Sequence, residues 1–232
     1  MQVFRDRRQA GRLLAQRFDR FVGDPGVIVL ALPRGGVPVG YEIAVRIGAP
    51  LDVLVVRKLG VPGYAELAMG AIASDGILVA DRRVIDMVGV PREAFDAVVA
   101  RERAELDRRE RAFRAGRSRL ELAGKTVILV DDGLATGASM AAAIDAVRTR
   151  QPARVIGAAP VAPPDICDAL GERADEMICL LTPPRLRAVG VWYQDFTQTS
   201  DDEVRALLDA AAREQRAHAE AARGAEPVSP AR

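Results

Sequence analysis

Short apolar runs alternate with amphipathic stretches along this chain, and the two patterns predict different elements. Five runs are almost wholly apolar and rich in β-branched residues, which is typical of strands buried on both faces of a parallel sheet. The stretches between them have helical spacing. The sequence therefore predicts an α/β fold, with a mainly parallel twisted sheet of about five strands flanked by helices. The predicted strands span residues 27–32, 51–56, 126–130, 153–162 and 176–181.

Other segments add smaller features to this sheet. Residues 68–74 and 76–80 flank the turn dipeptide Asp75-Gly76 and predict a β-hairpin. The polar end, residues 223–232, predicts a flexible tail. We find no internal repeat and no domain boundary, so we expect a single domain over residues 1–232, with a small hood after the fifth strand.

Residues 91–120 predict an inserted charged helix with i,i+4 ion pairs such as Glu105 with Arg109. Its apolar stripe is narrow, and such a stripe is typical of a helix that lies over a surface or against a partner subunit. We therefore expect this helix outside the core and interpret it as the contact of a homo-oligomer. The stripe consists of Phe95, Val99, Leu106 and Phe113.

The composition is that of an ordinary globular protein, with 49% hydrophobic and 28% charged residues. Lys and Arg total 33 against 32 Asp and Glu, so the near-zero net charge argues against a general nucleic-acid or membrane polyelectrolyte. No apolar run reaches the ~18 residues of a membrane span. Five arginines fall within residues 1–18, which no secretory leader tolerates, and we expect a cytoplasmic protein.

Cysteine and histidine are too scarce for several kinds of site. Cys167 and Cys179 form no C-x-x-C pair, and we expect no zinc cage, iron-sulfur site or disulfide framework. His218 is the single histidine and lies near the end of the chain. Histidine-assisted nucleophiles are thereby nearly excluded. The chemistry must come from carboxylates, guanidinium groups, hydroxyls and backbone amides.

The predicted third strand runs straight into Asp131-Asp132, and ligands of parallel sheets bind at the carboxyl ends of strands. Glycines, two hydroxyls and a helix start follow in residues 133–139, and consecutive amides at a helix start bind phosphate. Two carboxylates beside a phosphate cradle suit a sugar phosphate. The simpler alternative is a strand-to-helix turn in which an aspartate acts as the cap. No Walker A loop occurs in the chain.

The string VILVDDGLATGAS, residues 127–139, resembles the phosphoribosyl-diphosphate signature of the type I phosphoribosyltransferase family. The resemblance implies that Asp131 and Asp132 hold the ribose 2- and 3-hydroxyls. It also implies that the loop wraps the 5-phosphate, with hydroxyl donors at Thr136 and Ser139. The hypoxanthine-guanine enzymes have an acid at the first loop position, so this loop is more similar to that of adenine and orotate enzymes. The loop residues are Ala135, Thr136, Gly137, Ala138 and Ser139.

Two further loops carry cations to the same rim. The segment Pro33-Arg34-Gly35-Gly36 resembles the pyrophosphate-binding loop of the family, which often contains a non-proline cis peptide bond. Arg57 and Lys58 follow the second predicted strand, and we expect them beside the leaving pyrophosphate as catalytic residues. Residues 60–66 then suggest a mobile lid. The alternatives are a structural turn and a solvated loop.

Trp192, Tyr193 and Phe196 cluster after the fifth strand in a chain with 4% aromatic residues. In the family a hood near this place recognises the acceptor base, and we expect Trp192 and Tyr193 to stack on it. Packing of the hood onto the sheet is the alternative, above all for Phe196. The resemblance covers residues 27–196, and the charged helix lies outside the common core.

The resemblance implies transfer of a 5-phosphoribosyl group from phosphoribosyl diphosphate to a nitrogen acceptor, a nucleobase, with release of pyrophosphate. Such an enzyme belongs to purine or pyrimidine salvage and uses Mg²⁺, which we expect Asp131 and Asp132 to hold through water. The alternative is a donor-sensing regulator that binds RNA or a protein, because residues 101–119 hold eight Arg against four acids. The i,i+4 pairing of these charges argues against nucleic acid. A Mg²⁺-dependent phosphohydrolase would need further catalytic groups that we do not find.

Overall fold

The computed structural model describes residues 3–114 and 120–224 and contains the predicted α/β architecture. Five strands form one parallel sheet in the order β2-β1-β6-β7-β8. All five residues of β1 are buried, and alternate residues belong to the cores on opposite faces, which explains the continuous apolar run. The bounds are β1 Val27–Ala31, β2 Leu51–Val53, β6 Thr126–Val130, β7 Arg154–Val161 and β8 Glu176–Leu181.

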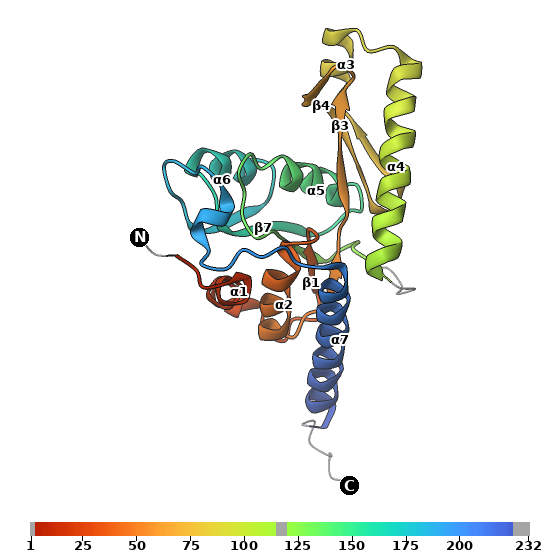
Figure 1. Ribbon diagram of the computed structural model, residues 1–232. Helices are drawn as coiled ribbons and strands as arrows, with labels where there is room; N and C mark the ends of the chain where they lie inside the picture. Colours follow the sequence, from red (N-terminus) through yellow and green to blue (C-terminus); the bar gives the residue numbers. More distant parts are fainter. Residues whose placement is uncertain (1–2, 115–119, 225–232) are drawn as a thin grey trace.

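Helices cover both faces of this sheet. In Figure 1, α1, α2 and α7 lie on one side and α5 and α6 on the other. Asp6 caps α1, because its carboxylate accepts a hydrogen bond from the Gln9 amide at 2.7 Å. A 3₁₀ segment, Gln16–Phe21, continues α1. The bounds are α1 Arg7–Ala15, α2 Gly36–Ile47, α5 Ala138–Arg148, α6 Pro164–Gly171 and α7 Asp201–Gly224.

A second, antiparallel sheet of three strands extends away from the first together with two helices (Figure 1). It corrects two predictions. The strand expected over residues 51–56 ends at Val53, and Arg57 and Lys58 lie within a strand of the second sheet instead of a rim loop. The segment 60–66, in which we expect a lid, contains the end of β3, the turn at Pro62 and Gly63, and the start of β4, and Gly63 has φ +81°. The bounds are β3 Val56–Val61, β4 Tyr64–Ala73, β5 Ile77–Ala80 and α3 Arg82–Val88.

The predicted hairpin is present, with the short 3₁₀ segment Ser74–Gly76 between β4 and β5. The remaining strand of the small sheet, β3, pairs with β4. Its residues alternate in burial: Leu59 and Val61 are buried in the core, whereas Lys58 and Gly60 are half-buried. One side of the small sheet thus joins the main core. The two sheets share one hydrophobic cluster.

The charged helix is α4, Arg92–Arg114, and its position differs from the prediction. Val98, Leu106 and Phe113 are buried, and α4 packs on β3 and α7. The stripe is narrow, yet it covers the apolar face of the small sheet, which would otherwise face water. The Glu105–Arg109 pair is present at 2.8 Å. Residues 115–119 of the predicted helix and 225–232 of the predicted tail lie outside the described residues.

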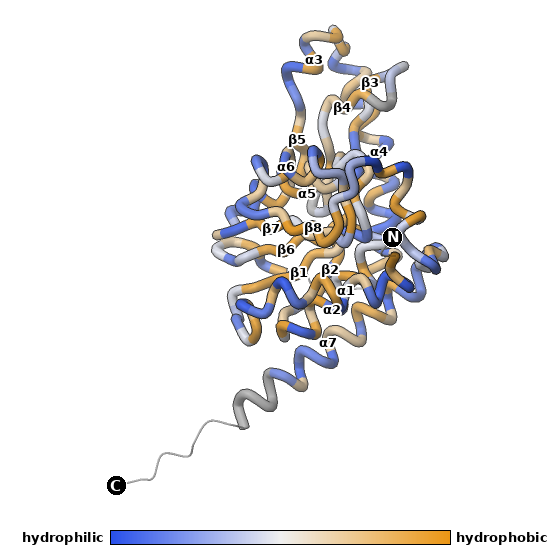
Figure 2. Tube along the Cα trace, turned by 90° about the vertical axis from the view of Figure 1, so that its left-hand side faces the viewer, coloured by the Kyte–Doolittle hydropathy of each residue, from blue (hydrophilic) through white to orange (hydrophobic). Residues whose placement is uncertain are grey.

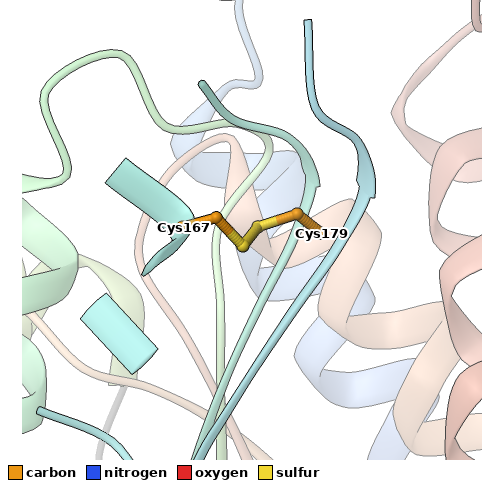
Figure 3. The surroundings of a disulfide bond; sticks show 2 residues. All are labelled: Cys167 and Cys179. Carbon is orange, nitrogen blue, oxygen red and sulfur yellow. A yellow bond between two sulfur atoms is a disulfide. The ribbon is translucent and has the colours of Figure 1, made fainter. Parts of the chain in front are cut away.

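Cys167 on α6 and Cys179 on β8 form a disulfide bond, with their Cα atoms 6.7 Å apart (Figure 3). This finding overturns the expectation that the cysteines form no bridge. The spacing of 12 residues did not show that α6 packs on β8 and brings the two side chains together.

The apolar residues concentrate in the strands at the centre, and the outer helices carry the hydrophilic ones (Figure 2). Within the described residues no helix is both long and apolar enough to cross a membrane.

Candidate active site

The register of the parallel sheet brings together the loop that follows β1 and the loop that follows β6. Strands β1 and β6 pair from Val27 with Thr126 to Ala31 with Val130, so the residues that follow both strands lie side by side. A Cβ atom on Gly35 would collide with the Asp132 carboxylate, and one on Gly36 would meet the Val130 carbonyl oxygen. Only glycine permits this close approach of the two loops. The peptide bond between Pro33 and Arg34 is cis, in agreement with the resemblance of this loop.

Asp131 and Asp132 are half-buried at the end of β6. The Asp132 amide donates a hydrogen bond to Asp131 Oδ1 at 2.9 Å. Burial and the neighbouring charge of Asp132 raise the pKa of Asp131. Burial also raises the pKa of Asp132, against the lowering effect of Arg7. A cation or hydroxyl donors placed at this pair would lower the cost of its partial burial.

Arg7 of α1 contacts this pair directly, and the sequence analysis missed it. Its Nε atom donates to Asp132 Oδ2 at 2.7 Å, and its Nη1 atom donates to the Thr197 carbonyl oxygen at 2.8 Å. The guanidinium lies 3.8 Å from the centre of the Phe196 ring. The separation of 125 residues between Arg7 and Asp132 hides the pair from any local motif.

Tyr193 holds the main chain of the same aspartate. Its hydroxyl donates to the Asp132 carbonyl oxygen at 2.5 Å. Its ring is buried between Phe4 and Phe196, with centres 5.4 and 5.0 Å away. Burial raises the pKa of Tyr193, so the phenol stays protonated and remains a donor. The ring is thus a support of the site and offers no face to a base, unlike the role expected for it. Trp192 is half-buried and packs beside it.

The predicted phosphate loop leads into α5, which begins at Ala138. Gly137 has φ +69°, and a Cβ atom there would lie 2.8 Å from Ile166 Cγ2, so this position requires glycine. The N-cap residue Gly137 has no side chain to cap the helix, and the first-turn amides have no partner within the helix. The Ala138 amide donates weakly to Thr136 Oγ1 at 3.4 Å. Together with the exposed residues Ala135 and Ser139, this loop can bind a phosphate.

Two cavities adjoin the rim, and Pro33 lines both. The larger cavity, about 810 Å³, lies between the sheet rim and α4; Arg34, Gly35 and Asp132 line it on one side. The smaller cavity, about 580 Å³, lies toward the second sheet and is bordered by Ser139. A ligand that reaches from the phosphate loop to the Pro33 loop would extend along both. The basic side chains of α4 and β3 on their walls are Arg57, Lys58, Arg101, Arg108 and Arg109.

Two of the three predicted cations of the rim, Arg34 and Arg57, are held by acids. Arg57 donates twice to Glu102 Oε2 of α4, at 2.9 and 2.6 Å. Arg34 donates to Asp201 at the start of α7, at 3.3 Å. Lys58 borders the smaller cavity. The sequence analysis missed Glu102 and the α4 arginines because it placed that helix away from the site.

Comparison with known proteins supports this arrangement. A family model described as the phosphoribosyl transferase domain matches residues 6–175. The chain belongs to this family. The match includes α1 with Arg7, both rim loops and the phosphate loop, and it confirms the type I phosphoribosyltransferase resemblance. It ends before the segment that carries Tyr193.

Two proteins of Mycobacterium tuberculosis, each named "Putative phosphoribosyl transferase" (Rv0571c and MT0597), are 50% identical to this phosphoribosyltransferase-family chain over 214 residues. The match covers 92% of this chain, which spans about half of those relatives, 48% of their length. The crystal structure of TT1426 from Thermus thermophilus is 42% identical, with a TM-score of 0.82. That match covers 89% of this chain and 97% of that chain.

Proposed function

We propose that this chain transfers a 5-phosphoribosyl group from phosphoribosyl diphosphate to a nitrogen acceptor of the nucleobase class and releases pyrophosphate. The observation that carries the proposal is the contact between two loops. Asp132 lies against Gly35 of the Pro33 loop, and the Asp131-Asp132 pair precedes the loop that leads into the start of α5. Carboxylates for ribose hydroxyls, amides for a phosphate and an approach for a diphosphate thus meet at one rim.

Each part of the donor has a group of suitable chemistry. Asp131 and Asp132 would accept hydrogen bonds from the ribose hydroxyls, and Thr136, Ser139 and the α5 amides would hold the 5-phosphate. Arg34 and the amides of the Pro33 loop would bind the diphosphate. As pyrophosphate leaves, the ribose gains positive charge and the leaving group negative charge. Catalysis is therefore mainly positioning and charge stabilisation.

Mg²⁺ fits the donor set of this rim. The described residues contain no group of three or more His, Cys, Asp or Glu side chains that could hold a metal. Mg²⁺ commonly uses one or two carboxylates together with substrate phosphates and water, and Asp131 and Asp132 would supply the carboxylates through water. When bound, the ion neutralises charge on the diphosphate.

The donor belongs to nucleotide metabolism, so we place the protein in the cytoplasm and in base salvage; purine, pyrimidine and other nitrogen acceptors all remain candidates. We keep the homo-oligomer as a proposal without a contact surface, because the α4 stripe that suggested the contact packs within this chain. The regulator that binds RNA is less well supported. Three of the α4 arginines that the sequence suggested for RNA are paired with acids: Arg108 and Arg109 with Glu105, and Arg101 with Glu102.

Calorimetric titration with phosphoribosyl diphosphate and Mg²⁺ tests the donor site. We expect the wild-type chain to bind and the double variant Asp131→Asn with Asp132→Asn to lose binding while its thermal unfolding stays cooperative. The matched control is Asp165→Asn with Asp168→Asn on α6, which removes the same charge from exposed positions. Donor affinity that is equal in wild type and the rim double variant would refute the assignment. A screen of bases for pyrophosphate release then identifies the acceptor.

A further inference from the structure

Arg7 lines the larger cavity and makes three contacts within the chain. Its Nε hydrogen bond goes to Asp132 Oδ2, its Nη1 hydrogen bond goes to the Thr197 carbonyl oxygen, and its plane stacks on Phe196. The side chains of Arg7 and Asp132 are 11% and 14% exposed. A guanidinium that donates hydrogen bonds from two of its nitrogen atoms and packs on an aromatic ring can rotate very little.

These contacts also fix the partner. Asp132 is held at its carboxylate by Arg7 and at its main-chain carbonyl by Tyr193. Both holding groups come from outside β6, Arg7 from α1 and Tyr193 from the segment after β8. A charge-assisted hydrogen bond is stronger at a partly buried position than in water, because solvent screens it less. The carboxylate therefore has one orientation, along the wall of the larger cavity.

We propose that Arg7 is the positioning residue of the site: it holds the Asp132 carboxylate in the orientation that receives a ribose hydroxyl of the donor. This inference rests on the proposed function. Arg7 occupies Oδ2, which leaves the carboxylate edge on the cavity wall for the hydroxyl. An acid already fixed in place loses less rotational freedom when the donor binds, so the donor binds more tightly. Arg7 acts through Asp132, so its effect must vanish when Asp132 is changed.

Arg8 is a matched control on the same helix. It also pairs with a carboxylate, that of Glu42, and its guanidinium also lies over an aromatic ring, that of Tyr41 at 4.5 Å. It borders neither of the two cavities beside Asp132 and the phosphate loop, and lines a smaller one of about 180 Å³ that Arg7 also borders. Arg8→Met thus removes the same kinds of contact from α1 and leaves Asp132 untouched.

The experiment measures the dissociation constant of phosphoribosyl diphosphate with Mg²⁺ by calorimetry. We expect Arg7→Met to weaken binding by about tenfold to a hundredfold, the size of one charge-assisted hydrogen bond. Arg7→Lys keeps the charge and should restore part of the affinity, whereas Arg8→Met should leave the constant unchanged. Asp132→Asn alone keeps Asp131, so we expect weakened but measurable binding, and in this background Arg7→Met should add nothing further, because the two changes remove the same interaction.

The outcomes separate the two proposals. If the wild-type chain binds no donor, the proposed function fails and this inference fails with it. If the wild type binds and Arg7→Met binds equally well, the inference alone is wrong. Full additivity of Arg7→Met and Asp132→Asn also overturns it, because a merely structural role of Arg7 would weaken both backgrounds alike. Should Arg7→Met not fold, Arg7→Lys and its combination with Asp132→Asn give the same comparison.

Discussion

The ion pair between Glu102 and Arg57 connects the inserted helix α4 to β3 beside the site, and its removal should lower the free energy of unfolding measurably. The change is Glu102→Gln, which keeps the shape of the side chain and removes its charge. Arg57 donates twice to Glu102 Oε2, at 2.9 and 2.6 Å. The Glu102 and Arg57 side chains are 10% and 29% exposed, so the variant leaves a guanidinium partly buried without its counter-charge.

The magnitude follows from these exposures. Breaking a fully buried ion pair costs about 3 to 5 kcal/mol, and an exposed pair contributes about 0 to 1 kcal/mol. Arg57 retains contact with water and glutamine retains one acceptor, so we expect a loss of about 2 kcal/mol. For a domain of this size that loss lowers the melting temperature by about 4 to 8 °C.

The difference in unfolding free energy between wild type and Glu102→Gln should depend on pH. Burial raises the pKa of Glu102, but the hydrogen bonds from Arg57 and Arg101 lower it more, so it lies below its usual value. A carboxyl with a lowered pKa in the folded state stabilises the protein above its unfolded pKa. This stabilisation disappears as the pH falls through the folded value. The gap between wild type and Glu102→Gln should thus be full at pH 7 and shrink below about pH 4.

Urea unfolding at several pH values measures the gap. The control is Asp96→Asn, which breaks the exposed pair between Arg92 and Asp96 on the same helix, with side chains 86% and 57% exposed. We expect that variant to stay within about 0.5 kcal/mol of wild type at every pH. A Glu102→Gln loss as small as the control, or a loss that is the same at pH 3 and pH 7, would refute the reasoning.

Three further predictions concern the fold. Leu106→Ala should lower the free energy of unfolding, measured by urea denaturation, by about 3 kcal/mol, because this α4 side chain is 1% exposed. A change within experimental error would mean that α4 is a surface helix and that Leu106 is not part of the core. Gly137→Ala should destabilise the protein by more than about 1 kcal/mol and more than Gly124→Ala, which has a similar φ but open space around it, as calorimetric melting would show. Equal effects would mean that the Gly137 collision is absent. Alkylation of the never-reduced, unfolded chain should label neither Cys167 nor Cys179, and reduction should cost about 3 kcal/mol for this loop length; two labelled thiols would disprove the bridge.

The sequence by itself determined the parallel sheet and the chemistry at its rim. A strand buried on both faces must be apolar throughout, so its residues mark it without any knowledge of its neighbours. The string over residues 127–139 placed Asp131, Asp132 and the phosphate loop in order, because these groups lie close together along one strand and one helix start.

Only the tertiary structure decided which distant residues meet at this rim. Arg7 and Tyr193 reach Asp132 from opposite ends of the chain, and Glu102 reaches Arg57 from the inserted helix. The narrow stripe of α4 looked like that of a surface helix because a sequence does not show that the small sheet presents an apolar face to be covered. A local sequence pattern indicates which face of a segment is buried. Which other segment covers that face depends on how all the segments pack together.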